Sequence, residues 1–470
     1  MRTTPPPPPP PARRLPLRGL PALSALLLCA AAPLGGSLGA QQAQPGQGLR
    51  GKISELFIFG SGQEPLFLGG SADPNNPASI RAHGTHFIPS AAQQNGSVIL
   101  FVTDAISANI GSIPIGSTSG GETFRFEGGV PVKTSISAGP IFGERAQTLG
   151  RGRALAGVNR TAFTFRTLRG VDLENIELNF THENVDFEGC DEQFNADCSQ
   201  MGVPNLENDV IQVRLALDID VAVTSFYLTY GLTDHIDVSA VVPLVSTTFN
   251  GRSDAQVFPF GGPTAAHFFA GTPESPSLAA TRATEGSAFG IGDVAVRLKV
   301  GVRDLPRTSV ALLGDARFAT GSEDDLLGAG RFSARGLAVL SARAGAFSPH
   351  ANVGYLYTTG KDRNDAILAT LGFDHLLADR VTLAADLVSE LQVGTTRLTL
   401  PQPVTYNAPF RRVVNPTLIP DMRDDLVNGS FGFKLNAGPG ITLVGNALFP
   451  LNRGGLRPEV AYTGGVEYTF

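Results

Sequence analysis

The stretch Val460-Ala461-Tyr462-Thr463-Gly464-Gly465-Val466-Glu467-Tyr468-Thr469-Phe470 decides the fold. Most of its even positions are apolar or aromatic, and its odd positions are small or polar. A period of two predicts a β-strand with one apolar face. In a transmembrane barrel that face meets lipid, and the other face lines the lumen. An ordinary edge strand closing a soluble sheet is the alternative.

The end of this strand also resembles a sorting signal. Val466, Tyr468 and Phe470 alternate up to a terminal aromatic residue, as in the C-terminal signature that the outer-membrane barrel assembly machinery reads. We therefore expect that machinery and the lipid of the bacterial outer membrane as partners.

The same alternation recurs along the chain, so we predict an all-β fold. The fold class is a transmembrane antiparallel up-and-down barrel of about twelve strands, with fourteen as the alternative. An even number brings both ends of a bacterial barrel to the periplasm. The expected strands are residues 152–168, 209–231, 235–249, 289–303, 308–320, 332–347, 350–360, 366–377, 380–393, 425–437, 440–450 and 458–470. Short turns alternate with long loops at about 169–208, 251–288 and 394–424, as outer-membrane barrels require.

One strand changes its pattern midway. From Ile211 to Val223 every odd position is aliphatic, whereas Phe226, Leu228 and Tyr230 place the apolar residues at even positions. A one-residue insertion reverses the faces of a strand, so this change of parity predicts a β-bulge near Thr224 and Ser225.

The composition excludes several classes. The chain has 470 residues and a formal net charge of -6, from Lys+Arg 36 and Asp+Glu 42, which argues against a nucleic-acid binder with a basic face. Three cysteines exclude a disulfide-rich scaffold. No apolar run of about 20 residues follows the first 40, which excludes helical membrane spans.

The expected domains are a signal peptide over 1–40, a pre-barrel segment over 41–150 and the barrel over 151–470. Basic residues, the apolar run 22–32 and small residues at 37–40 are typical of a cleaved export signal. Cys29 leaves a lipoprotein signal open, and Arg13-Arg14 a twin-arginine signal. The pre-barrel segment is either a plug in the lumen or a periplasmic lead.

Several motifs resemble one family. They are Tyr230-Gly231-Leu232-Thr233-Asp234-His235-Ile236-Asp237 followed by Pro243, Gly290-Ile291-Gly292-Asp293, Thr320-Gly321, and the upstream stretch from Gly139-Pro140-Ile141-Phe142-Gly143-Glu144-Arg145-Ala146 through Leu149-Gly150-Arg151-Gly152. Together they resemble the outer-membrane barrel family of the meta pathway of phenol degradation, a relative of the long-chain fatty-acid transporters. The resemblance covers about 140–470. It implies a channel or transporter, often for apolar or aromatic compounds, and it carries over no catalytic residue.

Charges at mid-strand belong in the lumen, because an Arg or Lys on the lipid face costs about 2–4 kcal/mol. Basic and acidic candidates are nearly balanced, which argues against a strongly ion-selective pore. Cross-strand ion pairs that only hold the barrel closed are the alternative. The pore-lining candidates are Arg160, Arg166, Arg214, Asp218, Asp220, Asp237, Asp293, Arg297, Lys299, Asp315, Arg317, Arg335, Arg343, Asp386, Glu390, Lys434, Glu459 and Glu467, with Asp374 also on this face.

Cys190 and Cys198 lie in the first long loop, and an exported chain favours a disulfide between them. Acidic residues around them suit calcium, although a solvated acidic loop is the more common outcome. His83 and His86 lack an obvious third ligand, so we predict no metal site there, and we expect no cofactor.

We therefore expect an outer-membrane channel or transporter that passes small apolar or aromatic solutes by passive diffusion. A structural, adhesive or receptor barrel is the second hypothesis. A barrel hydrolase is the third; the scattered His residues form no recognisable Ser/His motif, so we expect no enzyme and no catalytic residue.

Overall fold

The computed structural model describes residues 48–59, 66, 68, 102–106, 124–127, 130–133, 137–181, 189, 191–192, 209–259, 267–272, 274–360, 363–407 and 410–470. The predicted signal peptide lies outside the described residues. None of the helices described here is long and apolar enough to cross a membrane.

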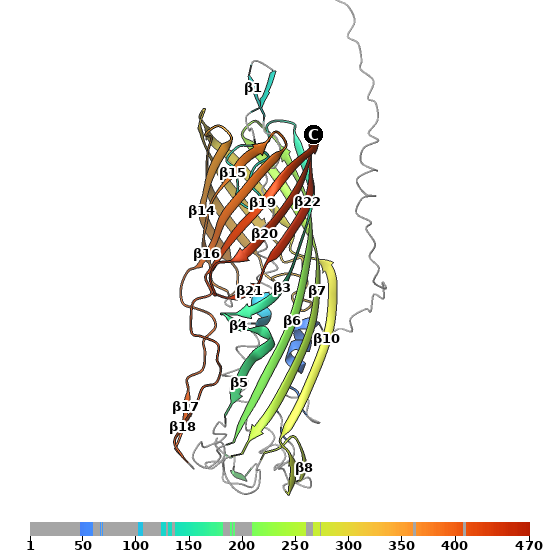
Figure 1. Ribbon diagram of the computed structural model, residues 1–470, viewed down its shortest axis with the longest axis vertical. Coiled ribbons are helices and arrows are strands. Elements are labelled where there is room, and N and C mark those ends of the chain that lie inside the picture. Colours follow the sequence, from blue (N-terminus) through green and yellow to red (C-terminus); the bar gives the residue numbers. More distant parts are fainter. Residues whose placement is uncertain are drawn as a thin grey trace, which may run out of the picture. The chain divides into compact units, whose positions relative to one another are not determined.

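Twelve strands of the described part close into an antiparallel ring, which confirms the predicted barrel (Figure 1). The last strand pairs with the first from Tyr462 opposite Ala162 to Thr469 opposite Leu155. In ring order the strands are β3 (Ala154–Leu168), β6 (Val210–Gly231), β7 (Ile236–Phe258), β11 (Ala295–Asp304), β12 (Thr308–Arg317), β13 (Ser333–Ala342), β14 (Phe347–Thr358), β15 (Ala366–Ala378), β16 (Val381–Gln392), β19 (Leu426–Gly438), β20 (Ile441–Pro450) and β22 (Ala461–Thr469).

Further strands lie outside this ring. β10 (Ala279–Ile291) pairs with β7, β5 (Ile176–Phe180) pairs with β6, and β4 (Val171–Asp172) and β21 (Leu456–Pro458) pair with β3. The remaining elements are α1 (Leu49–Glu55), the 3-10 turn η2 (Leu173–Asn175) and the hairpins β1 (Phe124–Glu127) with β2 (Val130–Lys133), β8 (Ala270–Thr272) with β9 (Ser275–Ser277), and β17 (Val404–Tyr406) with β18 (Arg412–Val414).

Two predicted boundaries were wrong for one reason. A single strand was expected over 289–303, but β10 ends at Ile291 and β11 begins at Ala295. The third strand was expected to end at 249, but β7 continues to Phe258, because β10 supplies it with a partner as far as Gln256. Residues 292–294 mark the point at which the chain leaves that hairpin and enters the ring.

β6 and β7 are much longer than a bilayer needs. β6 has 22 residues and β7 has 23, whereas about 9–11 tilted residues span the hydrocarbon core. The short turns lie at the same end of the ring as the carboxyl terminus (Figure 1), the end that faces the periplasm in bacterial barrels. At the opposite end β6, β7 and β10 continue beyond the shorter strands, and we call this part the outer extension.

The polarity of β6 inverts without any bulge, so the predicted bulge near Thr224 and Ser225 was wrong. Its pairing with β7 runs unbroken through Thr224 opposite Leu244, and odd positions stay buried along the whole strand. What changes is the surroundings. In the outer extension apolar side chains face inward and polar ones face water; in the ring Phe226 and Leu228 face outward while Ser225 and Thr229 are buried.

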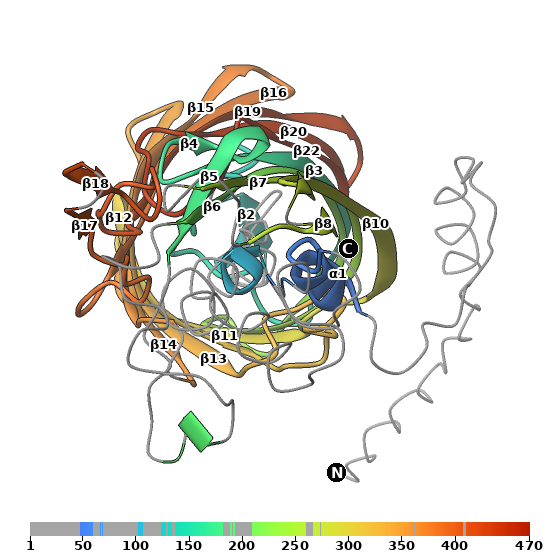
Figure 2. The same cartoon turned by 90° about the horizontal axis from the view of Figure 1, so that it is seen from below.

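The outer extension has its own apolar core. Leu49 and Ile53 of α1, with Leu56 and Phe57 after it, pack in one buried cluster with the inward residues of β5 and β6. Seen along the barrel axis, α1 lies inside the circle of strands (Figure 2). Arg50 fixes it: its backbone N–H donates to Asp324 at 2.9 Å, and its guanidinium contacts Asp104 at 2.6 Å and also Glu323.

Candidate functional site

The lumen of the ring is lined by charged and polar side chains. Most predicted lining residues are buried there, and Arg335, Arg343 and Glu390 are partly buried. Arg343 pairs with Asp304 at 3.1 Å, and Glu390 pairs with Arg363. The buried members are Asp237, Asp293, Arg297, Lys299, Asp315, Arg317, Asp374, Asp386, Lys434 and Glu467.

Six predicted lining residues lie on the outer face instead. Their side chains point outward, on the polar face of the strands, where water rather than lipid surrounds the outer extension. The prediction assumed that the outward face meets lipid along the whole strand, so it placed these polar side chains in the lumen. The six are Arg160, Arg166, Arg214, Asp218, Asp220 and Glu459.

Residues 137–150, which we call the lumen segment, contact the barrel wall through many hydrogen bonds. The backbone N–H of Glu144 donates to Asn352 at 2.8 Å, and the Asn352 amide donates back to the Glu144 carbonyl at 2.9 Å. The N–H groups of Ala146 and Leu149 donate to Ser341 and Asp237 at 2.9 and 3.0 Å. Wall strands from β7 to β16 therefore hold this irregular backbone, whose polar groups need partners once buried.

Two charges of the lumen segment are neutralised by the wall. Arg145 donates to Asp374 on β15 at 2.7 Å. Glu144 lies 3.0 Å from Lys299 and 3.5 Å from Arg297, both on β11. Lys299 also donates to the Arg145 carbonyl at 3.0 Å. All these side chains are at most 5% exposed, so water screens their attraction poorly.

A glycine lets the lumen segment approach the wall at its tightest point. A Cβ on Gly143 would lie 2.3 Å from Nε2 of His350. The same His350 atom is 2.7 Å from Asp386 Oδ1, and both side chains are at most 1% exposed. No side chain larger than hydrogen fits between this pair and the backbone.

A further buried pair lies near the strands that close the barrel. Lys434 of β19 donates to Glu467 of β22 at 3.2 Å, and the Tyr227 hydroxyl of β6 donates to the same carboxylate at 3.1 Å. These contacts tie three ring strands together through side chains as well as through backbone pairing.

Sequence reasoning missed Glu144, Arg145 and His350 as lumen residues. Glu144 and Arg145 stand together in the stretch that carries the family resemblance, and that acid–base pair amid glycine and apolar residues was the available signal. The sequence around His350 gave no such signal, because a histidine near a turn can lie on either face of a strand.

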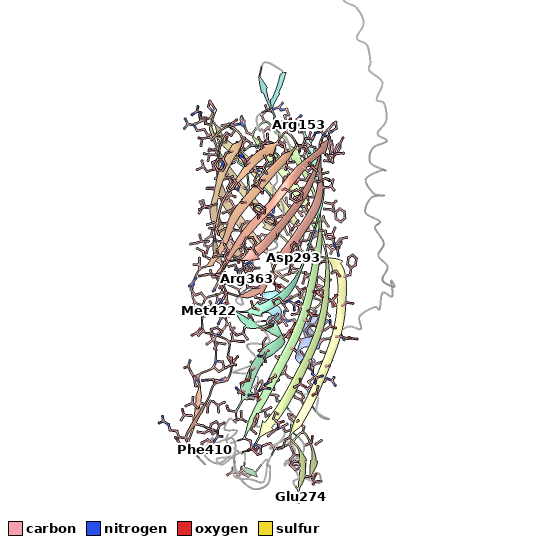
Figure 3. The ribbon with its side chains drawn as sticks, in the orientation of Figure 1. Arg153, Glu274, Asp293, Arg363, Phe410 and Met422 are labelled. Carbon is pink, nitrogen blue, oxygen red and sulfur yellow. The ribbon has the colours of Figure 1, made fainter. Side chains whose placement is uncertain are left out.

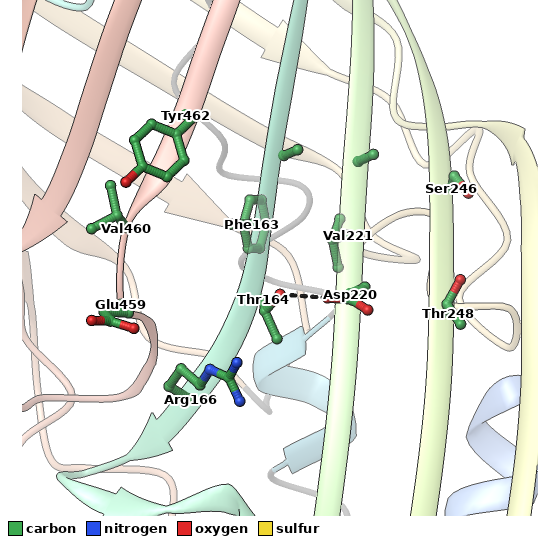
Figure 4. Close-up of a pocket in the computed structure, with 12 residues that line it drawn as sticks. Phe163, Thr164, Arg166, Asp220, Val221, Ser246, Thr248, Glu459, Val460 and Tyr462 are labelled. Atoms are coloured by element: carbon green, nitrogen blue, oxygen red, sulfur yellow. Dashed lines mark hydrogen bonds between the residues drawn. The ribbon is translucent and has the colours of Figure 1, made fainter. Parts of the chain in front are cut away.

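A surface pocket of about 550 Å³ lies on the outer face, near the break between β21 and β22 (Figure 4). Pro458 is opposite Phe165 and Tyr462 is opposite Ala162, so β3 has one residue fewer here than the facing chain. Arg166, Asp220 and Glu459 lie around the pocket. These three residues, which were predicted to line the lumen, therefore gather on the outer surface.

Three further predictions fall on residues that are not described. Cys190, Cys198, His83 and His86 lie outside the described residues. Within those that are described, no group of three or more His, Cys, Asp or Glu side chains could hold a metal ion.

Comparison with known proteins bears out the predicted family resemblance over part of the chain. A family model described as "Putative MetA-pathway of phenol degradation" matches residues 207–391. This range runs from β6 to β16 and includes most of the charged lumen wall. No curated protein matches the chain.

Several solved outer-membrane barrels match about two thirds of the chain. An outer-membrane channel from Pseudomonas putida F1 has 12% identity and a TM-score of 0.38, over 69% of this chain and 98% of that one. The P. putida toluene transporter TodX has 10% identity and a TM-score of 0.30, over 68% and 89%. The identities and the TM-scores are both low, so these structures do not indicate what this chain transports.

Proposed function

We propose that this chain, matched over residues 207–391 by the family of the meta pathway of phenol degradation, is an outer-membrane channel for small apolar or aromatic solutes. Solutes move through it by passive diffusion, and the lumen segment acts as its plug. An N-terminal signal peptide, cleaved on export, delivers it to the outer membrane.

The contact between the lumen segment and the wall carries this proposal. A barrel that only anchors or displays loops needs ion pairs between its own strands. Here the buried charges of β11 and β15 are neutralised by Glu144 and Arg145 of a separate segment. A closure made of side-chain contacts can be released without breaking any strand pairing, which suits a channel.

The outer extension supports the apolar class of solute. Its interior is filled by Leu56, Phe57 and Phe180, among other buried apolar residues. Transfer of an apolar solute from water to such surroundings is favourable, whereas an ion would lose its hydration there. A solute entering from the outer end would meet this part before the charged wall.

Entry of N-phenyl-1-naphthylamine into intact Gram-negative cells tests the proposal, because a lipopolysaccharide layer slows this neutral aromatic probe. Cells that make the protein should take up the probe faster than cells that do not. Arg145→Met should speed entry further and raise the conductance of the purified protein in planar bilayers.

Arg166→Met is the matched control, because Arg166 pairs with Glu174 at 3.0 Å on the outer face. It should leave both readings at the wild-type value. Equal probe entry with and without the protein, together with no conductance from either arginine variant, would refute the channel.

A further inference from the structure

A small cavity lies at the outer end of the ring, and none of its lining residues belongs to the lumen segment. Its volume is about 50 Å³, and its lining comes from β12, β13, β14 and the start of β15. Asp293 and Arg363, both labelled in Figure 3, lie where the shorter strands end and β6 and β7 continue. A buried water needs about 10–15 Å³ measured in this way, so a group larger than one water fits.

One carboxylate in this lining is surrounded by three arginines. Asp315, 1% exposed in its side chain, lies 2.5 Å from Arg297, 3.2 Å from Arg335 and 3.5 Å from Arg317. Each guanidinium carries five N–H donors, and a carboxylate has roughly four acceptor positions. Asp315 therefore cannot satisfy the donors around it.

The other carboxylate of the lining does not make up the difference. Asp293 accepts the backbone N–H groups of Gly321 at 3.1 Å and Ala329 at 2.7 Å. Its acceptor positions are thus turned towards the loop after β12, and no arginine of the described chain lies within ion-pair distance of it.

Hydrogen-bond donors remain unused around the cavity. Arg335 Nε is buried and has no partner among the described residues, and neither has the hydroxyl of Thr358, a residue only 5% exposed. Arg317 is 9% exposed, and its one ion pair in the described chain is the 3.5 Å contact with Asp315. Donors buried without acceptors cost free energy, so a bound acceptor would relieve that cost.

We propose that this cavity is a binding site for the carboxylate group of a small apolar acid, held by Arg317, Arg335 and the Thr358 hydroxyl. A guanidinium matches a carboxylate in shape and charge. Leu356 and Leu368 supply the apolar part of the lining. The inference rests on the proposed channel function and adds to its solutes those that carry an acid group on an apolar body.

Titration calorimetry of the detergent-purified full chain with benzoate tests the site, and benzamide serves as the neutral probe of the same shape. Benzoate should bind saturably and benzamide should not. Arg335→Gln should weaken benzoate binding about tenfold or more, the ratio that corresponds to a lost hydrogen bond to a charged group.

Arg307→Gln is the matched control, because Arg307 lies in the exposed turn between β11 and β12. It should bind benzoate as the wild type does. Thr358→Val, which keeps the side-chain volume, should weaken binding several-fold and decides the question if Arg335→Gln does not assemble. Benzamide binding as tightly as benzoate, no saturable benzoate binding, or unchanged binding in Thr358→Val would each overturn the site.

The two proposals fail separately. Binding in detergent needs no passage of solute, and entry of a neutral probe needs no carboxylate site. Probe entry without benzoate binding would leave the channel standing and remove the acid site. Benzoate binding without probe entry or conductance would remove the channel, and with it the role of the site in transport.

Discussion

Arg145 Nη2 lies 2.7 Å from Asp374 Oδ2, and this pair joins the lumen segment to β15 across 229 residues of sequence. The Ser137 hydroxyl of the same segment donates to the same Asp374 oxygen. Arg145 Nη2 also donates to the Ser137 hydroxyl at 2.7 Å. The segment thus closes on one wall carboxylate from two positions.

Asp374→Asn should loosen the lumen segment, because it leaves Arg145 buried without a countercharge. Loss of one partner of a buried pair costs about 3–5 kcal/mol. Hydrogen exchange of residues 137–150 should rise, while exchange of the barrel strands stays slow. The double variant Arg145→Met with Asp374→Leu should exchange more slowly than Asp374→Asn alone. If it exchanges as fast or faster, the two charges are not coupled in the way described.

Gly143→Ala should displace the lumen segment, because the new Cβ would lie 2.3 Å from His350 Nε2. We expect faster probe entry and easier proteolysis of this segment. Gly314→Ala on β12 is the control, because a Cβ there meets nothing within 4 Å. Similar behaviour of both variants would show that Gly143 is not in close contact with the wall.

Leu312→Arg should destabilise the barrel by about 2–4 kcal/mol, the cost of a cation facing lipid near the bilayer centre. Leu312 is 54% exposed and lies midway along β12. Asp218→Arg, on the outward face of β6 in the outer extension, should change stability little because water surrounds it. Urea unfolding of both variants in lipid vesicles measures the difference. An equal loss at both positions would contradict the change of solvent along β6.

Glu467→Gln should lower the unfolding midpoint, because Lys434 then stays buried without a carboxylate and Tyr227 loses an ionised acceptor. Replacing the charged pair together, as Lys434→Met with Glu467→Leu, should cost less than the single change, since apolar side chains can replace a buried pair at similar volume. Thermal unfolding followed by circular dichroism gives both midpoints. The reverse order would mean that the pair is stabilising in its own right.

The ring could be predicted because each of its strands carries a local signal. Val466, Tyr468 and Phe470 show the alternation within a few residues, and so do Leu312 and its neighbours on β12. The number of ring strands and their order depend on such local patterns, and these predictions were confirmed. The turn expected between 347 and 350 was wrong, because β13 ends at Ala342 and β14 begins at Phe347.

The remainder depends on contacts between residues far apart in the chain. Period two separates the two faces of β6 but does not tell which solvent each face meets, so Arg214 and Asp218 were assigned to the lumen. The pairing of Glu144 with Lys299 joins an irregular segment to a strand about 150 residues later, and no periodic pattern reports such a pair. β10 lacks a clear alternation of apolar and polar residues, because every one of its residues is exposed or half-buried.

Because the pairing of β6 is unbroken through Thr224, this residue marks the level at which the outward face of the strand passes from water to lipid. Adding two residues before it would lengthen the outer extension and keep every side chain on its face. Adding one would turn Ile211 through Val223 towards water while leaving Phe226 in lipid, because one step of register exchanges the faces of a strand. A length change of two residues in β6, β7 or β10 therefore keeps every face, whereas a change of one would need a β-bulge to restore them.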